Sequence, residues 1–174
     1  MRRALADTRG SAASEMAMVL PAIAFILANI TDLGIYLYTR MQVELAAQEA
    51  VGAARMLCDT AAKLPATKGT NCPTLNSTMT AAAQTTSLGG NVTLGTISEA
   101  YYCATSSGSL TEVAAATATT VPADCSATVA TSTAKPGIYI TVPVSYTFTP
   151  VFPGATVAAL LPATITRSAW MRLQ

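Results

Sequence analysis

The pattern of hydrophobic and polar positions predicts one long helix in the N-terminal third of the chain. Residues 16–31 are apolar with few interruptions and correspond to about 24 Å of helix. Leucine or methionine then recurs every fourth position from residue 33 to residue 45, and a drifting apolar stripe continues to Leu57. No Gly-Pro break interrupts this part, so the pattern predicts one helix from about residue 12 to about residue 60.

Near the C-terminus the period changes to two, which predicts strands. In "GIYITVPVSYTFTP" the even positions from Ile138 to Phe148 are apolar, and most of the odd positions are polar or aromatic. Pro143 lies on the second face and favours an edge position or a bulge. The final "ATITRSAWMRLQ" predicts a partner strand, and the two together indicate a small antiparallel sheet.

The middle of the chain gives weaker signals. Residues 81–87 favour a short helix, and residues 91–97 alternate like a strand. Residues 105–134 are rich in Thr, Ala and Ser, so we expect irregular structure there. The connection "VFPGATVAALLP" is unusually apolar. It is either a loop or short helix packed on the sheet, which we favour, or a patch that touches membrane or a neighbouring subunit.

Composition excludes several classes of function. The 174 residues are 51% hydrophobic and 11% charged, which suits one modest domain with an anchor. The net charge is +1 and no basic run follows the N-terminus, which argues against a nucleic-acid partner. The chain has no histidine, no glycine-rich phosphate loop and no nucleophile elbow. We therefore expect no enzyme, no cofactor and no metal.

The four cysteines all follow the apolar segment, at Cys58, Cys72, Cys103 and Cys125. An even number suits two disulfides in an oxidising compartment. Zinc motifs place cysteines about two to four residues apart, and these are much farther apart. Three pairings are possible, and the sequence does not choose among them.

The charges flanking the apolar segment predict its orientation. Arg2, Arg3 and Arg9 precede it, against one acid, Asp7, and the first basic residue beyond it is Arg40. This asymmetry predicts a cytoplasmic N-terminus and an exported remainder.

Glu15 stands at the start of the apolar run and raises the question of its purpose. Three interpretations of Glu15 are open. It is an ordinary charge at a helix N-terminus, an incidental acid in the headgroup region, or a functional group. A cut after Gly10 would give Ser11 a new amine about 6 Å from Glu15 along a helix. An amine and a carboxylate on staggered subunits could then neutralise each other. We interpret Asp32, farther along, as structural.

The segment "RGSAASEMAMVLPAIAFIL" continuing into "DLGIYLYTRMQVELAAQEAVGAAR" resembles the TadE-type minor pilins, or pseudopilins, of the tight-adherence (Tad) type IV pilus system. The terminal "VPVSYTFTPVFPG…LLPATITRSAWMR" is similar to the strand-loop-strand of that family. The resemblance implies cleavage by a prepilin peptidase between Gly10 and Ser11, with Glu15 as an assembly contact. It implies as partners other pilins or pseudopilins, an inner-membrane assembly platform and the lipid bilayer, in a role in pilus assembly and surface adherence.

The resemblance also implies an organisation for the whole chain. Residues 1–10 are the leader, and residues 11–60 the helix, with 11–38 in the membrane and 39–60 exported and amphipathic. Residues 61–174 form an exported β-rich domain, in a pilin-like α+β fold. We expect an inner-membrane protein with a periplasmic C-terminal domain, which reaches the cell surface on assembly. Separately from the resemblance, our working hypothesis among the three pairings is Cys58–Cys72, which would join the helix end to the domain, with Cys103–Cys125, which would bridge the Thr-rich segment.

Three other hypotheses remain open. A signal peptidase could cut before Asn29 and release a secreted protein. An anchored binding module unrelated to pili would look similar apart from Gly10 and Glu15. An anchored hydrolase without histidine would need a Ser–Lys arrangement, and the lysines after the helix all lie in loop-like stretches: Lys63, Lys68 and Lys135.

Overall fold

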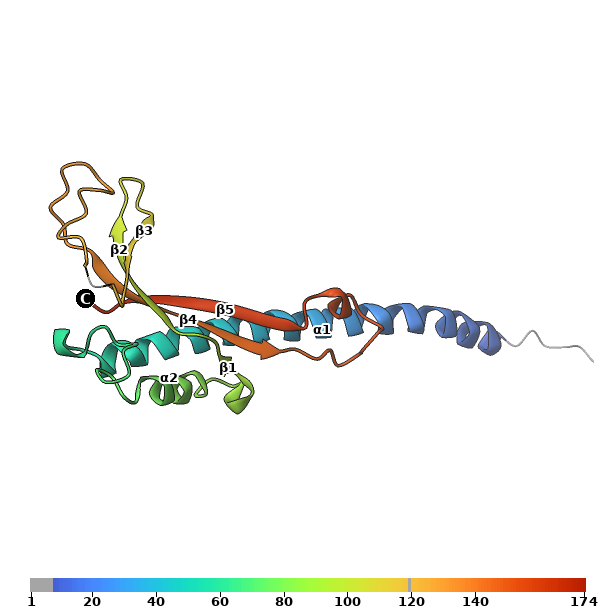
Figure 1. The fold of residues 1–174 in the computed structure, drawn as a ribbon. Coiled ribbons are helices and arrows are strands. Elements are labelled where there is room, and N and C mark those ends of the chain that lie inside the picture. Colours follow the sequence, from blue (N-terminus) through green and yellow to red (C-terminus); the bar gives the residue numbers. More distant parts are fainter. Residues whose placement is uncertain (1–7, 119) are drawn as a thin grey trace, which may run out of the picture. The chain divides into compact units, whose positions relative to one another are not determined.

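The computed structural model describes residues 8–118 and 120–174, with side chains from Ser14 onward. It contains the long helix α1 (Thr8–Leu57), the short helix α2 (Leu75–Ala83) and an antiparallel sheet. The predicted α+β class, with a long apolar N-terminal helix followed by a small sheet, is confirmed (Figure 1). The chain forms two compact units. The first holds residues up to Tyr38 together with Phe148–Ala163, and the second holds Thr39–Thr147 and Thr164–Gln174.

Helix α1 runs without interruption over 50 residues and includes Pro21. Its buried positions within the second unit are small or β-branched: Val43, Ala46, Ala47, Ala50, Val51 and Ala54. The every-fourth series of large apolar residues is exposed instead, from Leu33 at 45% to Met41 at 64%. The buried face of α1 therefore follows the small residues, because alanine lets another element approach the helix axis closely.

The sheet has five strands, built around β4 (Gly137–Thr147). β5 (Thr164–Arg172) pairs with β4 along nearly its whole length, from Tyr139↔Arg172 to Thr147↔Thr164. β1 (Thr93–Leu94) and β2 (Ser98–Ala104) pair with successive parts of β4. β3 (Leu110–Ala115) pairs with β2.

Strand β4 confirms the predicted alternation and supplies the centre of the core. Its even positions from Ile138 to Val144 are buried, with Ile140, Val142 and Val144 at 0% exposure, and Tyr146 is half-buried. The prediction of an edge position for Pro143 is wrong, because β4 has paired strands on both sides. Pro143 instead lies where the facing chain passes from β1 to β2, and there its carbonyl accepts a hydrogen bond from the Gly95 amide at 2.8 Å. A Cβ at Gly95 would lie 2.8 Å from the Pro143 ring, so only glycine fits this approach.

The middle of the chain is more regular than its composition predicts. The short helix predicted over residues 81–87 is α2, and it begins earlier, at Leu75. The strand predicted over residues 91–97 is reduced to the two residues of β1 after a 3₁₀ turn, Gly89–Asn91. Strands β2 and β3 have no counterpart in the prediction, and β3 lies inside the Thr/Ala-rich segment. Its pairing with β2 supplies an order that local composition does not reveal.

Two disulfides fix the second unit, and the prediction of disulfides is confirmed. Cys58, directly after α1, is bonded to Cys72 in the loop before α2. Cys103 of β2 is bonded to Cys125 in the Thr-rich segment. These are the two pairs that we considered above. They close loops of 14 and 22 residues, which restricts the unfolded chain where local structure is sparse.

A buried acid holds the loop that follows Cys58. The Glu99 carboxylate accepts hydrogen bonds from the amides of Ala66 and Thr67 at 2.9 and 2.8 Å. The Thr67 hydroxyl adds a third bond of 2.8 Å. Glu99 is 8% exposed, so these bonds replace water at a carboxylate that has little access to it. The loop is thereby attached to β2.

The core of the second unit should be sensitive at Ile140. Replacing Ile140 with Ala is expected to lower the free energy of unfolding by about 2–5 kcal/mol, because it leaves a cavity in the central strand. Thermal or urea denaturation of the detergent-solubilised protein, followed by Trp170 fluorescence, measures this loss. Leu110→Ala is the control, since Leu110 is 41% exposed and its loss should stay within about 0.5 kcal/mol. Equal losses in the two variants would contradict this account of the core.

Candidate membrane and assembly surface

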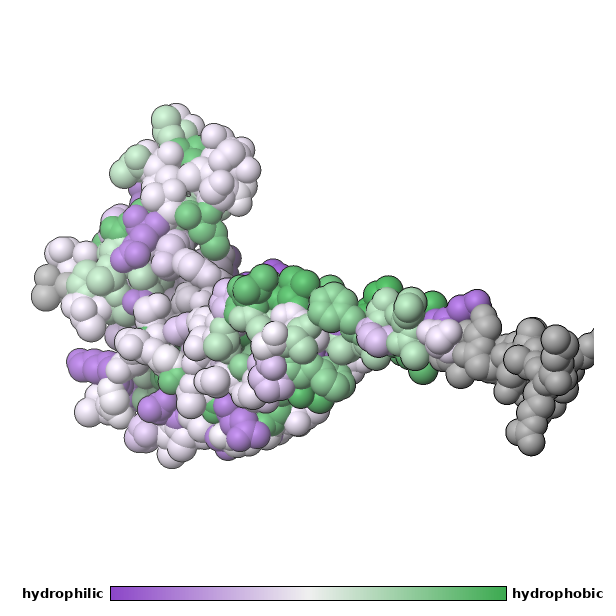
Figure 2. Space-filling view, turned by 90° about the vertical axis from the view of Figure 1, so that its right-hand side faces the viewer, coloured by the Kyte–Doolittle hydropathy of each residue, from purple (hydrophilic) through white to green (hydrophobic). Residues whose placement is uncertain are grey.

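The N-terminal half of α1 is an apolar helix with little covering. The span that begins at Ser14 is long and apolar enough to cross a membrane, with a mean hydropathy of 1.9 in its most apolar window, of which 6% is buried. Apolar side chains are exposed all around it, for example Met18 at 82%, Ile26 at 56% and Ile30 at 63%. Figure 2 shows hydrophobic residues gathered along this part of the helix. A helix that is apolar on every side suits lipid or a bundle of similar helices.

The predicted cleavage residues lie at the start of this helix. Gly10 and Ser11 belong to the first turns of α1, and the structure describes their backbone only. The leader residues Arg2, Arg3 and Asp7 lie outside the described residues. Glu15 is on the helix and is exposed. Ser11 and Glu15 thus lie four positions apart on one helix, and the cleavage between Gly10 and Ser11 that the resemblance implies stays a prediction.

Asp32 is the most deeply buried charged residue of the described helix, at 0% exposure. One oxygen of its carboxylate accepts the Val151 amide at 2.9 Å. The other accepts the Phe152 amide at 3.2 Å and the Thr156 hydroxyl at 2.6 Å. All of these donors lie in the loop between β4 and β5, Phe148–Ala163, which we call the proline loop. Asp32 is therefore structural, as the sequence indicates, because it fixes this loop to the helix.

Two neighbours extend the contact along the same face of α1. The Asn29 side-chain oxygen accepts the Val157 amide at 2.8 Å. The ring of Tyr36 meets the ring of Phe148 edge to face, with centroids 5.1 Å apart. Asn29, Asp32 and Tyr36 are spaced by three and four residues, the spacing of one helix face. The loop thus follows α1 from Tyr36 back toward Asn29.

This arrangement differs from the favoured interpretation of the apolar connection. The sequence favours a loop packed on the sheet, but the proline loop forms one compact unit with the N-terminal part of α1. The physical reason is Asp32, a carboxylate in an apolar helix that requires donors. The sequence does carry a signal of this contact, because Asn29, Asp32 and Tyr36 place polar groups on one face of an otherwise apolar helix.

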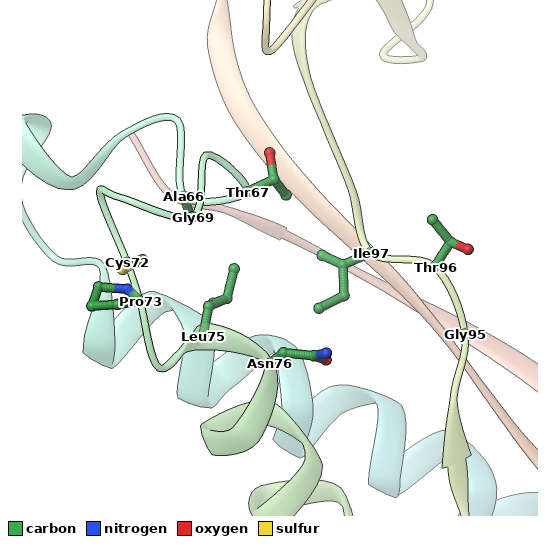
Figure 3. Close-up of a pocket in the computed structure, with 10 residues that line it drawn as sticks. All are labelled: Ala66, Thr67, Gly69, Cys72, Pro73, Leu75, Asn76, Gly95, Thr96 and Ile97. Carbon is green, nitrogen blue, oxygen red and sulfur yellow. The ribbon is translucent and has the colours of Figure 1, made fainter.

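A cleft of about 320 Å³ lies between α2 and residues 95–97 in the second unit. Leu75 and Ile97 point toward each other across it, and Thr67 and Asn76 lie at its border (Figure 3). None of its ten lining residues is charged, and no metal-binding cluster of His, Cys, Asp or Glu occurs among the residues that the structure describes. The cleft therefore offers polar contacts but no acid–base group.

The sheet carries an aromatic cluster that the sequence does not reveal. The Tyr102 ring meets Tyr139 and Trp170 edge to face, at centroid distances of 5.6 and 5.3 Å. Partial burial raises the pKa of Tyr102, and the charge of Glu112 on the neighbouring strand raises it further. Strand pairing brings these rings together from β2, β4 and β5, so local sequence gives no sign of the cluster.

Fold and surface together define a protein with one long apolar N-terminal helix and a small disulfide-linked sheet domain. Residues 10–51 match the family model described as TadE-like protein. The match covers Gly10, Ser11, Glu15 and Asp32, and it confirms the resemblance to TadE-like proteins found in the sequence. This TadE-like segment supports a protein associated with the Tad pilus. No curated protein and no solved structure matches the chain.

The role of Asp32 is open to a direct test. In Asp32→Ala, the Val151 and Phe152 amides lose their acceptor, so their hydrogen exchange should accelerate by roughly tenfold or more. Asp32→Asn keeps one oxygen and should give an intermediate rate. Hydrogen–deuterium exchange with mass spectrometry over residues 148–163 measures both.

Asp59→Asn is the control for this experiment. Asp59 is exposed and pairs with Lys63 at 2.9 Å in the second unit, so its loss should leave exchange in the proline loop unchanged. Unaltered exchange in Asp32→Ala would show that the loop is held by other contacts.

Proposed function

We propose that this protein is a minor pilin, or pseudopilin, of a Tad-type pilus, and that it takes part in pilus assembly or initiation and in surface adherence. The observation that carries the proposal is the TadE-like match over residues 10–51, which contains Gly10, Ser11 and Glu15 in order. The exposed apolar helix supports it, because such a helix can pass from lipid to a bundle of similar helices without changing its surface.

In this proposal each N-terminal residue has a distinct role. A prepilin peptidase cuts between Gly10 and Ser11 and removes the basic leader. The new amine of Ser11 and the carboxylate of Glu15 then neutralise each other between staggered subunits, which sets the stagger. Before assembly α1 anchors the protein in the bacterial inner membrane, with the N-terminus cytoplasmic and the disulfide-linked domain in the periplasm. The partners are other pilins and the assembly platform.

The protein in this proposal is a structural subunit and not an enzyme. The cleft between α2 and residues 95–97 is lined by uncharged residues, which supports this assignment. The second candidate is an anchored binding module unrelated to pili. The aromatic cluster at Tyr102, Tyr139 and Trp170 favours it, because exposed rings are frequent in binding surfaces. The two candidates differ in what happens at Gly10 and Glu15.

The intact mass and N-terminal sequence of protein from its native membrane test the processing step. We expect a mature chain that begins at Ser11, because the peptidase removes residues 1–10. A chain that begins at Asn29 would indicate a secreted protein and contradict the pilin proposal. A chain that retains its leader would favour the anchored module.

Replacing Glu15 with Ala tests the assembly role. The variant should be cut and inserted into the membrane at the wild-type level, since the apolar span is intact. It should nevertheless be lost from the sheared surface fraction, by roughly tenfold or more, if the Ser11 amine needs this carboxylate. Glu44→Ala is the matched control, because Glu44 is an exposed acid later on the same helix. Wild-type amounts of surface protein in Glu15→Ala would favour the anchored module.

A further inference from the structure

The proline loop presents a concentrated apolar surface. Four of its large side chains are exposed, namely Val151 at 57%, Phe152 at 42%, Val157 at 59% and Leu160 at 85%. They accompany the exposed apolar residues of α1 within one compact unit. An exposed apolar patch of this kind marks a contact with membrane or protein.

The position of the proline loop along α1 indicates that its apolar patch contacts the membrane. The loop contacts the helix at Tyr36, Asp32 and Asn29, which spans about 10 Å toward the N-terminus. A hydrocarbon core of about 30 Å takes about 20 helical residues. A span that begins with the apolar run at Met16 therefore extends to about residue 35, and Asn29 lies inside it. The short 3₁₀ helix Val157–Leu160 begins at the residue that is bonded to Asn29.

The composition of the loop suits the shallow part of a bilayer. No charged residue occurs between Lys135 and Arg167. Pro150, Pro153 and Pro162 have no amide hydrogen to satisfy. Part of the other amides are paired: three donate to α1 side chains, and four donate to carbonyls within the loop, from Phe148, Ala155, Ala159 and Leu161. The Gly154 amide has no acceptor among the residues that the structure describes, so it needs water or a headgroup.

Irregular backbone that keeps unpaired polar groups stays out of the hydrocarbon centre and lies where water and headgroups reach it. We propose that the proline loop lies in the shallow part of the bilayer beside α1, in the leaflet nearer the C-terminal end of the span, with the side chains of Val151, Phe152, Val157 and Leu160 against the upper part of the lipid acyl chains. The membrane contact of this protein is then a helix plus a loop, which fixes both the depth and the rotation of α1. This inference depends on the membrane anchor in the proposed function, and it does not depend on cleavage or assembly.

Quenching by brominated lipids tests the proposal on the full chain. Trp170 is the single tryptophan, so Trp170→Phe gives a silent background. Leu160→Trp is introduced into it, and Val157→Trp provides a second probe if the first variant fails to fold. Each protein is reconstituted, one copy per disc, in phosphatidylcholine–phosphatidylglycerol nanodiscs that contain lipids brominated at shallow or deep acyl positions. Ile26→Trp in the same background reports the helix itself, since Ile26 is 56% exposed within the span.

We expect blue-shifted emission from Leu160→Trp and at least a twofold loss of its fluorescence with shallow bromine, as large as that of Ile26→Trp with its most effective lipid. Emission typical of water, with quenching by acrylamide instead, would overturn the proposal. Blue-shifted emission without bromine quenching would also overturn it, because the probe would then be covered by protein. Leu110→Trp places a probe in the sheet. If bromine quenched it as strongly as Leu160→Trp, the result would contradict a specific membrane contact of the proline loop.

The helix probe separates this proposal from the proposed function. Quenching of Ile26→Trp without quenching of Leu160→Trp would overturn the loop contact and leave the membrane anchor standing. Absence of quenching in both would overturn the anchor and with it the pilin proposal.

Discussion

The carboxylate of Asp32 sets the requirement that the first compact unit satisfies. A charge on an otherwise apolar helix is tolerated only with donors at close range, and α1 itself cannot supply them, since its backbone amides are used within the helix. The donors come from the proline loop: two consecutive amides and a threonine hydroxyl. Because that loop joins β4 to β5, the requirement of one acid determines where the connection of the two longest strands must lie.

The second unit repeats this solution with different residues. Glu99 also accepts two consecutive amides and the hydroxyl of a threonine, from Ala66 and Thr67. In both cases a proline directly precedes the two amides, Pro65 in one loop and Pro150 in the other. Proline restricts the backbone before the donors, which reduces the conformational freedom lost when they converge on one carboxylate. A chain with few charges thus uses two of its acids to fix loops, where other proteins use packing or ion pairs.

The sequence predicts the elements that have a strong period and misses those made by pairing. Helix α1 and strands β4 and β5 follow from their apolar spacing, and the α+β class follows from them. The Thr/Ala-rich segment hides β3, because its order comes from β2 and from the Cys103–Cys125 bond. For the candidate site, Gly10, Ser11 and Glu15 are local motifs and are visible in sequence. The partner of Asp32 is not, since a hydrogen bond to a distant loop leaves no local pattern.

The long sequence separation between Asp32 and its donors affects when the first compact unit can form during synthesis. The helix emerges from the ribosome first, and the Val151 amide follows 119 residues later. At typical rates of about 5–20 residues per second, this interval is about 6–24 s. Throughout it, Asp32 lacks its donors from the protein, so water must solvate the carboxylate. The first compact unit therefore cannot close before residues 148–163 have been synthesised, and a truncated product that lacks the loop leaves Asp32 without its protein donors.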